Sequence, residues 1–117
     1  MAEYVAPVRE IGFVINELLD YSRLSGLADF SDASSELTSA ILDEAAKFAG
    51  QVLAPLNHVG DQQGVRQQGD QVITADGFAA AYRLFVDNQW LSLAQDPQYG
   101  GQGLPYLIHL AASEMWN

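Results

Sequence analysis

The chain has 117 residues, enough for one domain with a real core, and 49% of them are hydrophobic. Its formal net charge of −10, from 15 acids against 5 bases, argues against nucleic acid or an anionic membrane surface as a partner. The absence of cysteine excludes disulfides, thiolate zinc sites and a cysteine nucleophile, and no signal peptide or run of ~18 apolar residues is visible, so we expect a cytoplasmic protein.

The first element is predicted as a helix over residues 7–21. Apolar residues recur along it at helical spacing, and Pro7 suits the first turn, where its missing N–H is no loss. The small polar residues 25–35 are predicted to form a connection. In that connection Asp32 or Ser34 can cap the next helix, because each side chain can accept from its open N–H groups.

The longest helix is predicted over residues 35–56. A wide apolar stripe runs along it, which is typical of a helix that packs against more than one neighbour. Pro55 is expected to end or kink this helix, since it deletes a backbone bond and clashes one turn back. The polar, glycine-containing residues 57–71 are predicted as a long surface connection, with Val72 and Ile73 briefly extended.

A third helix is predicted to carry Phe78, Tyr82 and Phe85 at helical spacing. Thr74 or Asp76 is expected to cap its start. Its end is predicted at Asn88, because asparagine tolerates the left-handed conformation that stops a helix.

A fourth helix is predicted to open at Pro105 and to bury Ile108, Ala111, Ala112 and Met115 on one face. The apolar pattern runs to the last residues without a glycine, a proline or a basic last turn, which predicts a fragment of a longer protein. The fold class that follows is all-α, an up-down bundle of about four helices with a glycine-rich loop between two of them.

The glycine-rich loop DPQYGGQGLP, residues 96–105, invites comparison with phosphate-binding loops. Gly101 and Gly103 could be two glycines of a dinucleotide fingerprint, but Tyr106 stands where the third belongs and no good strand precedes them. The P-loop is excluded because Gly-Lys-Ser/Thr does not occur. The loop is therefore interpreted as a turn-rich link that lets the backbone approach another surface closely.

Histidines and acids do not assemble into a catalytic or metal pattern. His58 and His109 lie far apart and have no partner at metal-ligand spacing. Asp43 and Glu44 are adjacent, so they point in different directions on a helix, and Glu114 is best interpreted as a solvated or paired acid. No catalytic residue, cofactor-binding residue or metal ligand is assigned in this chain.

A resemblance to the N-terminal helical domain of flavin-dependent acyl-CoA dehydrogenases is carried by ILDEAAKFAGQVLAPLN, GFAAAYRLFVDNQWLSLAQDPQYGGQGLP and LIHLAASEMWN. The first segment, YVAPVREIGFVINELLD, is similar to the extra stretch of a long subgroup, the methylmercaptopropionyl-CoA dehydrogenase type. Two departures are Asn88, where glycine is expected, and Ala75, where the family often has proline. The resemblance implies that residues 1–30 form an N-terminal extension with one helix and that residues 31–117 form the helical domain, truncated in its last helix.

The resemblance also implies what each part does. In that family a middle β domain and a C-terminal helical domain contact the flavin, and the C-terminal domain carries the catalytic glutamate. FAD is therefore expected in the parent enzyme and not in this chain alone. The glycine loop joins two helices and shapes the edge of the acyl cavity. The residues implied at that edge or at an interdomain contact are Tyr99, Gly100, Gly101, Gly103, Leu104, Met115 and Trp116.

Three functions remain open at this point. In the first, the parent would oxidise an acyl-CoA to the 2,3-enoyl-CoA and pass electrons to a partner such as electron-transfer flavoprotein. The isolated chain, without the middle and C-terminal domains, would be inactive. It would also self-associate through its fourth helix. A free-standing helical protein-interaction module is the alternative. A helical carrier of acyl chains is the third.

Overall fold

The computed structural model describes residues 3–117, most of which are helical, and the predicted all-α class is confirmed. A small β-hairpin is the exception. The elements are α1 (Val8–Phe13) with a π-helical turn (Val14–Leu18), α2 (Ser22–Ser25), a 3₁₀ turn (Ala28–Phe30), α3 (Ser35–Phe48) with a π-helical turn (Ala49–Leu53), α4 (Ala54–Gln63), β1 (Arg66–Gln68), β2 (Gln71–Ile73), α5 (Phe78–Asp87), 3₁₀ turns (Trp90–Ser92 and Pro97–Tyr99) and α6 (Tyr106–Glu114).

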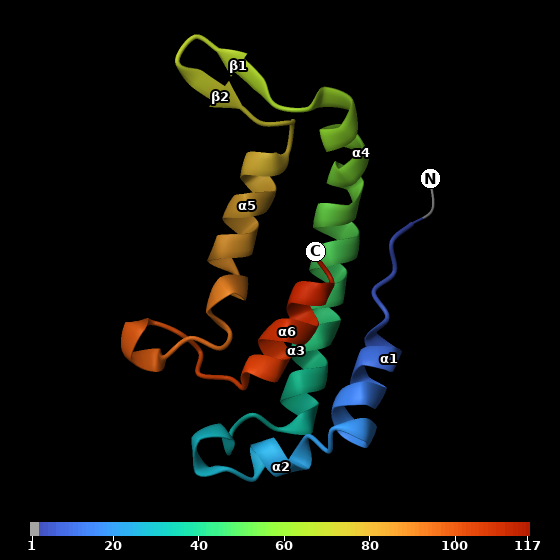
Figure 1. The fold of residues 1–117 in the computed structure, drawn as a ribbon, viewed down its shortest axis with the longest axis vertical. Helices are drawn as coiled ribbons and strands as arrows, with labels where there is room; N and C mark the ends of the chain where they lie inside the picture. The colour runs from blue at the N-terminus through green and yellow to red at the C-terminus, as the bar shows by residue number, and fades with distance from the viewer. Residues whose placement is uncertain (1–2) are drawn as a thin grey trace.

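The molecule is flat. Helices α3 and α4 form one long spine, α1 and α6 lie against its α3 half, and α5 runs beside α4 (Figure 1). The described residues measure 54 × 37 × 16 Å, and their radius of gyration is 16.8 Å, against about 13 Å for a compact domain of this length. Much of each helix therefore has no second layer above it.

The core lies where α3 crosses α6. Leu42 and Ala45 of α3 and Ile108 and Ala112 of α6 are almost completely buried. The small alanines let the two backbones approach closely, and the isoleucine and leucine fill the remaining space. The predicted apolar face of the fourth helix is confirmed, because Ala111 and Met115 are buried with Ile108 and Ala112.

The N-terminal segment shares this core. Ile11 of α1 and Ile15 of its π-helical turn join the same cluster of buried side chains as α3 and α6. The helix predicted over residues 7–21 ends at Leu18, and the short helix α2 follows it. Residues 1–2 of the predicted extension lie outside the described part, and its boundary at residue 30 stays a prediction.

The start of α3 follows the predicted capping pattern. The Ser34 hydroxyl accepts a hydrogen bond from the Leu37 N–H at 3.1 Å, which satisfies one of the open donors of the first turn. The buried Thr38 hydroxyl donates to the Ser34 carbonyl at 3.0 Å. Of the two predicted caps, Ser34 is the one that the structure uses.

The predicted helix end near Leu56 is wrong, so Pro55, which was expected to end or kink the helix, does not end it. The helix continues through α4 to Gln63. The reason is the π-helical turn over Ala49–Leu53, which inserts an extra residue and restarts the hydrogen-bond ladder one residue before the proline. Pro55 thereby falls in the first turn of a new α-helical segment, where its missing N–H leaves no broken bond.

The long connection predicted over residues 57–71 is also wrong. Its first half belongs to α4, and its second half forms the antiparallel hairpin β1–β2, in which Arg66 pairs with Ile73 and Gln68 with Gln71. Gly69 sits in the tight turn with φ of 64°, a conformation that glycine adopts at little cost. The predicted extended pair Val72 and Ile73 is confirmed as part of β2.

Helix α5 has the predicted apolar residues but not the predicted cap. Its N-cap is Gly77, with φ of 86° and no side-chain bond. Asp76 instead accepts from the Gln63 amide at 3.0 Å, and its N–H donates to the Gln63 side-chain oxygen at 2.8 Å. This exchange ties the exit of the hairpin to the end of α4. The helix ends before Asn88 as predicted, but the left-handed residue is Gln89, with φ of 61°.

Candidate functional site

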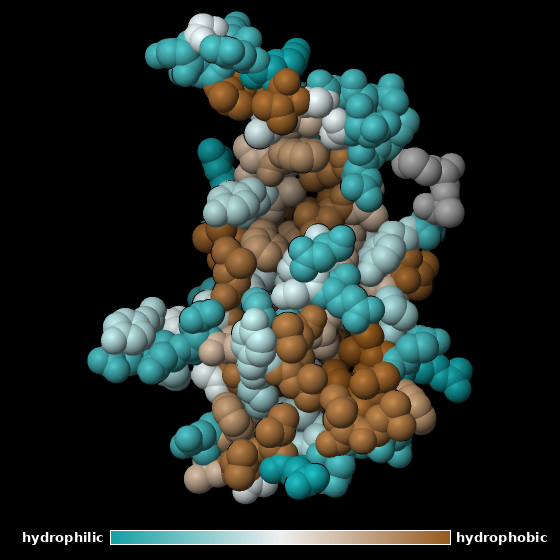
Figure 2. All heavy atoms as spheres, in the orientation of Figure 1, coloured by the Kyte–Doolittle hydropathy of each residue, from teal (hydrophilic) through white to brown (hydrophobic). Residues whose placement is uncertain are grey.

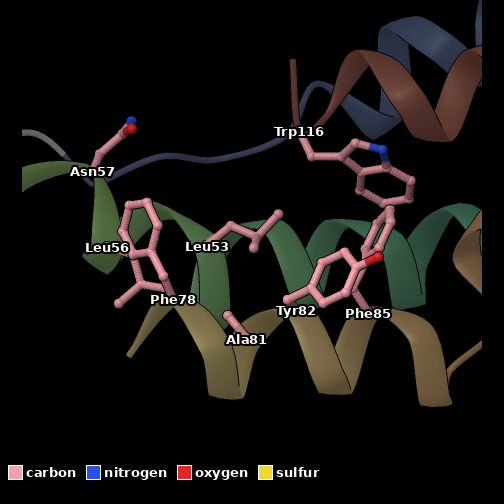
Figure 3. Close-up of a pocket in the computed structure, with 8 residues that line it drawn as sticks. All are labelled: Leu53, Leu56, Asn57, Phe78, Ala81, Tyr82, Phe85 and Trp116. Atoms are coloured by element: carbon pink, nitrogen blue, oxygen red, sulfur yellow. The ribbon is translucent and has the colours of Figure 1, made fainter. Parts of the chain in front are cut away.

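An open apolar groove between α4 and α5 is the main candidate site (Figure 3). Its volume is about 340 Å³. Most of its surface is apolar, and the lining residues with polar side-chain atoms are Asn57, Tyr82 and Trp116, of which Asn57 points its amide away from the other side chains in Figure 3. The lining residues are Leu53, Leu56, Asn57, Phe78, Ala81, Tyr82, Phe85 and Trp116.

Helix α5 is held against the spine at one end by glycine. A Cβ on Gly60 would lie 2.7 Å from the Phe78 ring, so only glycine lets that ring approach α4 this closely. A Cβ on Gly77 would lie 2.8 Å from a methyl group of Leu56. This end of the groove is therefore closed by direct contact between the two helices.

An aromatic cluster holds the other end of the groove. The Phe85 ring packs on Phe48, with centroids 5.9 Å apart, and edge-on against Trp116 at 5.3 Å. Trp116 also packs on Trp90 at 5.4 Å. Between the two closed ends, the side chain of Tyr82 remains 63% exposed, so the groove is fixed in shape but open to whatever covers it.

Trp116 separates the groove from a second cavity of about 240 Å³. The residues that line the second cavity include Leu53, Glu114 and Met115 in addition to Trp116. Met115 and Trp116, two of the residues implied at an acyl-cavity edge or interdomain contact, are therefore brought together by the end of α6. Their function stays a prediction.

The glycine loop lies away from that cavity. Tyr99 is 82% exposed, and Gly100 and Gly103 take positive φ angles of 88° and 66°. A Cβ on Gly101 would overlap the backbone of Gln95, so this glycine is needed for space. Leu104 packs on the central core. The implied residues thus fall into two groups, one in the loop and one at the end of α6.

The backbone of the loop does not fit a phosphate. The Gln102, Gly103 and Leu104 N–H groups donate to the carbonyls of Ser92, Gln95 and Leu93 at 2.9, 3.0 and 2.9 Å. The preceding loop amides donate to Asp96 or Pro97. A phosphate needs amides that point outward and are free, and these are engaged within the chain. This geometry supports a structural link, and it offers no cradle for the diphosphate of a flavin dinucleotide.

The histidines lie apart, as the sequence indicates. His58 is exposed on α4. His109 on α6 stacks beside Tyr106, with ring centroids 5.2 Å apart, and its buried Nδ1 atom has no hydrogen-bond partner. Within residues 3–117, no three acids or histidines are grouped so that they could hold a metal ion.

One ion pair lies on the surface of α3. Lys47 donates to Glu44 at 2.6 Å, and both side chains are mostly exposed. The hydrogen bond to Glu44, and then its negative charge, raise the pKa of Lys47 above its ordinary value. Because the pair is exposed and screened by water, it marks a solvated face and no reactive group.

The groove residues were recognised in the sequence as a helix face and missed as a site. Phe78, Tyr82 and Phe85 were predicted to share one side of a helix, which the structure confirms. On the facing wall, Leu53 and Leu56 belong to the apolar stripe predicted along the helix of residues 35–56. One sequence signal could have indicated that these two helix faces form a site. Together they carry more large apolar side chains than the rest of the chain can bury.

In the part of the chain from residue 3 onward, the helices are too short or too polar for a transmembrane segment.

The sequence and the helical fold together make the chain similar to an acyl-CoA dehydrogenase, and the resemblance predicted from its segments is confirmed. It is 37% identical over 114 residues, or 97% of its length, to the 3-methylmercaptopropionyl-CoA dehydrogenase of Ruegeria pomeroyi. The chain spans 19% of the length of that relative. No family profile matches the chain.

Proposed function

We propose that this chain is the N-terminal helical part of an FAD-dependent acyl-CoA dehydrogenase, whose parent enzyme oxidises an acyl-CoA to the 2,3-enoyl-CoA. The observation that carries the proposal is the 37% identity over 97% of the chain to one such dehydrogenase. The parent would pass its electrons to a partner such as electron-transfer flavoprotein. Fold alone would be a weaker argument, because one fold supports many functions.

The role that we assign to these residues is packing. The groove between α4 and α5 would be covered by the middle or C-terminal domain of the parent, and the glycine loop and the end of α6 would form the edge of the acyl cavity. Support comes from the open groove, from its exposed Tyr82 and from the thinness of the molecule, 16 Å along its shortest axis. The cavity-edge residues in this proposal are Tyr99, Gly100, Gly101, Gly103, Leu104, Met115 and Trp116.

The chemistry is assigned to the rest of the parent. FAD, when bound there, would accept the hydride. We assign no residue of this chain to the removal of the substrate proton. Glu114 is exposed, and among the described residues no histidine, lysine, arginine or second acidic side chain lines the cavity of about 240 Å³ beside it, so we do not assign it as the catalytic base.

The proposal is tested by transplanting the chain. Residues 1–117 would replace the matching 114-residue segment of the Ruegeria pomeroyi enzyme, and acyl-CoA-dependent bleaching of the flavin would be measured. We expect a chimera that retains FAD and is reduced by substrate. A folded chimera that carries FAD but is inert to every acyl-CoA that reduces the Ruegeria enzyme would contradict the role at the cavity wall.

A spectrum of the chain alone separates the alternatives. After incubation with FAD and desalting, we expect no flavin absorbance, since the loop amides are already bonded. Flavin retained in proportion to protein would overturn the assignment of the chemistry to other domains. Heat released on titration with a fatty acyl-CoA would instead favour an acyl carrier.

The second candidate is a free-standing helical protein-interaction module. The same open groove favours it, because an apolar groove between two helices is a common seat for a partner. Reading the gene beyond the codon for Asn117 distinguishes the two: a stop codon there favours the module, and an open frame encoding the remaining dehydrogenase domains favours our proposal.

A further inference from the structure

A second groove, on the other side of α6, lies between α1 and α6. Its volume is about 300 Å³, and its walls are the apolar side chains of Ile11, Val14, Ile15, Leu107, Leu110 and Ala111. Val14 is 41% exposed and Leu110 51% exposed. Figure 2 shows apolar side chains gathered over α1 and the neighbouring part of α6. This groove is separate from the one between α4 and α5.

The rim of this groove carries two carboxylates. Glu10 of α1 and Glu114 of α6 are the ionisable side chains that line it, and both are exposed. The two helices run in opposite directions, so the start of α1 and the end of α6 lie at the same end of the groove (Figure 1). Within residues 3–117, neither carboxylate forms an ion pair. The nearest base along the chain, Arg9, does not line the groove.

We propose that the α1–α6 groove binds an amphipathic helix of a partner protein, whose apolar side chains end in a lysine or an arginine. The six apolar side chains provide the floor for a helical stripe, and Glu10 and Glu114 receive the positive charge at one end of it. The net charge of −10 supports this choice of partner, because association with a cationic segment is electrostatically favoured.

The same charges argue against two other occupants. A second copy of the chain, the occupant that self-association through the fourth helix would bring, would add its own net charge of −10 and further carboxylates to the rim, so we do not assign it to this groove. An anionic ligand, such as the phosphate-bearing part of a coenzyme thioester, would be repelled by Glu10 and Glu114. This inference goes beyond the proposed function, since that proposal assigns the α4–α5 groove, the glycine loop and the end of α6 to the parent and makes no use of the α1–α6 groove.

The test uses the whole chain and a labelled synthetic peptide, followed by fluorescence anisotropy. The peptide is helical, with leucines at positions i, i+3, i+4 and i+7 and two lysines at one end of that stripe. We expect micromolar binding that weakens about tenfold in the double variant Glu10→Gln/Glu114→Gln, because two partly exposed ion pairs are lost. Added salt should weaken binding to the unaltered chain and affect the double variant less.

Matched variants locate the contact. Glu17→Gln/Glu36→Gln removes the same charge from positions that line neither groove, and it should bind the peptide like the unaltered chain. Leu110→Ser should weaken binding, while Tyr82→Ser, in the α4–α5 groove, should not. This pattern separates failure of the present inference from failure of the proposed function.

Four outcomes would overturn the inference. They are no binding at peptide concentrations up to about 1 mM, equal binding of a peptide with glutamates in place of the lysines, an equal loss in the Glu17→Gln/Glu36→Gln control, and a dimer of the chain that the peptide dissociates. The last would identify a second copy as the occupant.

Discussion

Two helix pairs within one small chain are packed in opposite ways. Where α3 meets α6, Ala45 and Ile108 have no exposed surface and Leu42 retains 2%. Where α4 meets α5, the buried residue of α5 is Ala81, and Tyr82 is 63% exposed. The difference follows from side-chain size. Alanines on both α3 and α6 allow close contact along the helices, whereas large rings on α5 touch the spine at its two ends and leave a groove between them.

The two helix pairs differ in how much apolar surface they leave exposed. The α3–α6 pair is a finished core whose side chains have no further surface to bury. The α4–α5 pair has apolar surface that only another molecule or domain can remove from water. Loss of a side chain should therefore cost folding free energy at the first pair and binding free energy at the second.

The largest effect is expected at the closed pair. Ile108→Ala should lower the free energy of unfolding by about 3 kcal/mol, because it leaves a cavity where no side chain can collapse inward. Urea unfolding followed by circular dichroism measures this loss. The matched control is Leu110→Ala on the same helix, which is 51% exposed and should cost less than about 1 kcal/mol. Equal losses in the two variants would mean that α6 is not packed as described.

The glycine loop tests packing of backbone on backbone. Gly101→Ala should cost about 2 kcal/mol, because its Cβ would overlap the backbone of Gln95 and the loop must move. Gly12→Ala is the control. Its Cβ meets no atom within 4 Å, so it should stabilise helix α1 by up to about 1 kcal/mol. The melting temperatures of the two variants should shift in opposite directions. An unchanged melting temperature for Gly101→Ala would contradict the claim that this position has no room for a Cβ.

A smaller effect is expected at the cap of α3. Ser34→Ala should lower the free energy of unfolding by about 1 kcal/mol, because the Leu37 N–H loses its acceptor. Ser34→Asp keeps an acceptor at this position and should restore most of the stability. If the aspartate variant unfolds at the same denaturant concentration as the alanine variant, the hydroxyl contributes by some means other than capping.

The smallest effect on stability is expected at the open pair. Tyr82→Ala should change the free energy of unfolding of the chain by less than about 0.5 kcal/mol, since the ring is mostly in water. In the chimeric dehydrogenase the same change should weaken attachment of the helical domain, seen as a lower melting temperature or faster loss of flavin. A large loss in the isolated chain would show that the groove is closed in solution.

Local chemistry in the sequence was enough to place several helix ends. Ser34 caps α3, α5 ends before Asn88, and Pro105 precedes α6. The signals of Ser34 and Pro105 act within one turn of helix, where a side-chain oxygen or a missing N–H decides the outcome. Asn88 marks the right place, but Gln89 adopts the left-handed conformation that was expected of it. The apolar face of α6 was equally readable, because periodicity reports which side of a helix is buried.

Signals that depend on distant residues were not readable. Pro55 breaks an ordinary α-helix, and only the preceding π-helical turn makes room for it. Asp76 resembles a cap, but Gln63 from another helix engages it. The apolar residues of α5 were evident, yet the groove was not, because a groove needs two elements whose separation no local pattern encodes.

The sequence by itself therefore determined the helical class, the main helix faces and the kinship with an acyl-CoA dehydrogenase, since these depend on periodicity, capping chemistry and identity along the chain. Tertiary structure alone decided how closely each pair of helices packs. Close contact buries α3 against α6, while the rings of α5 hold a groove open, and this difference separates the core from the surfaces left for partners.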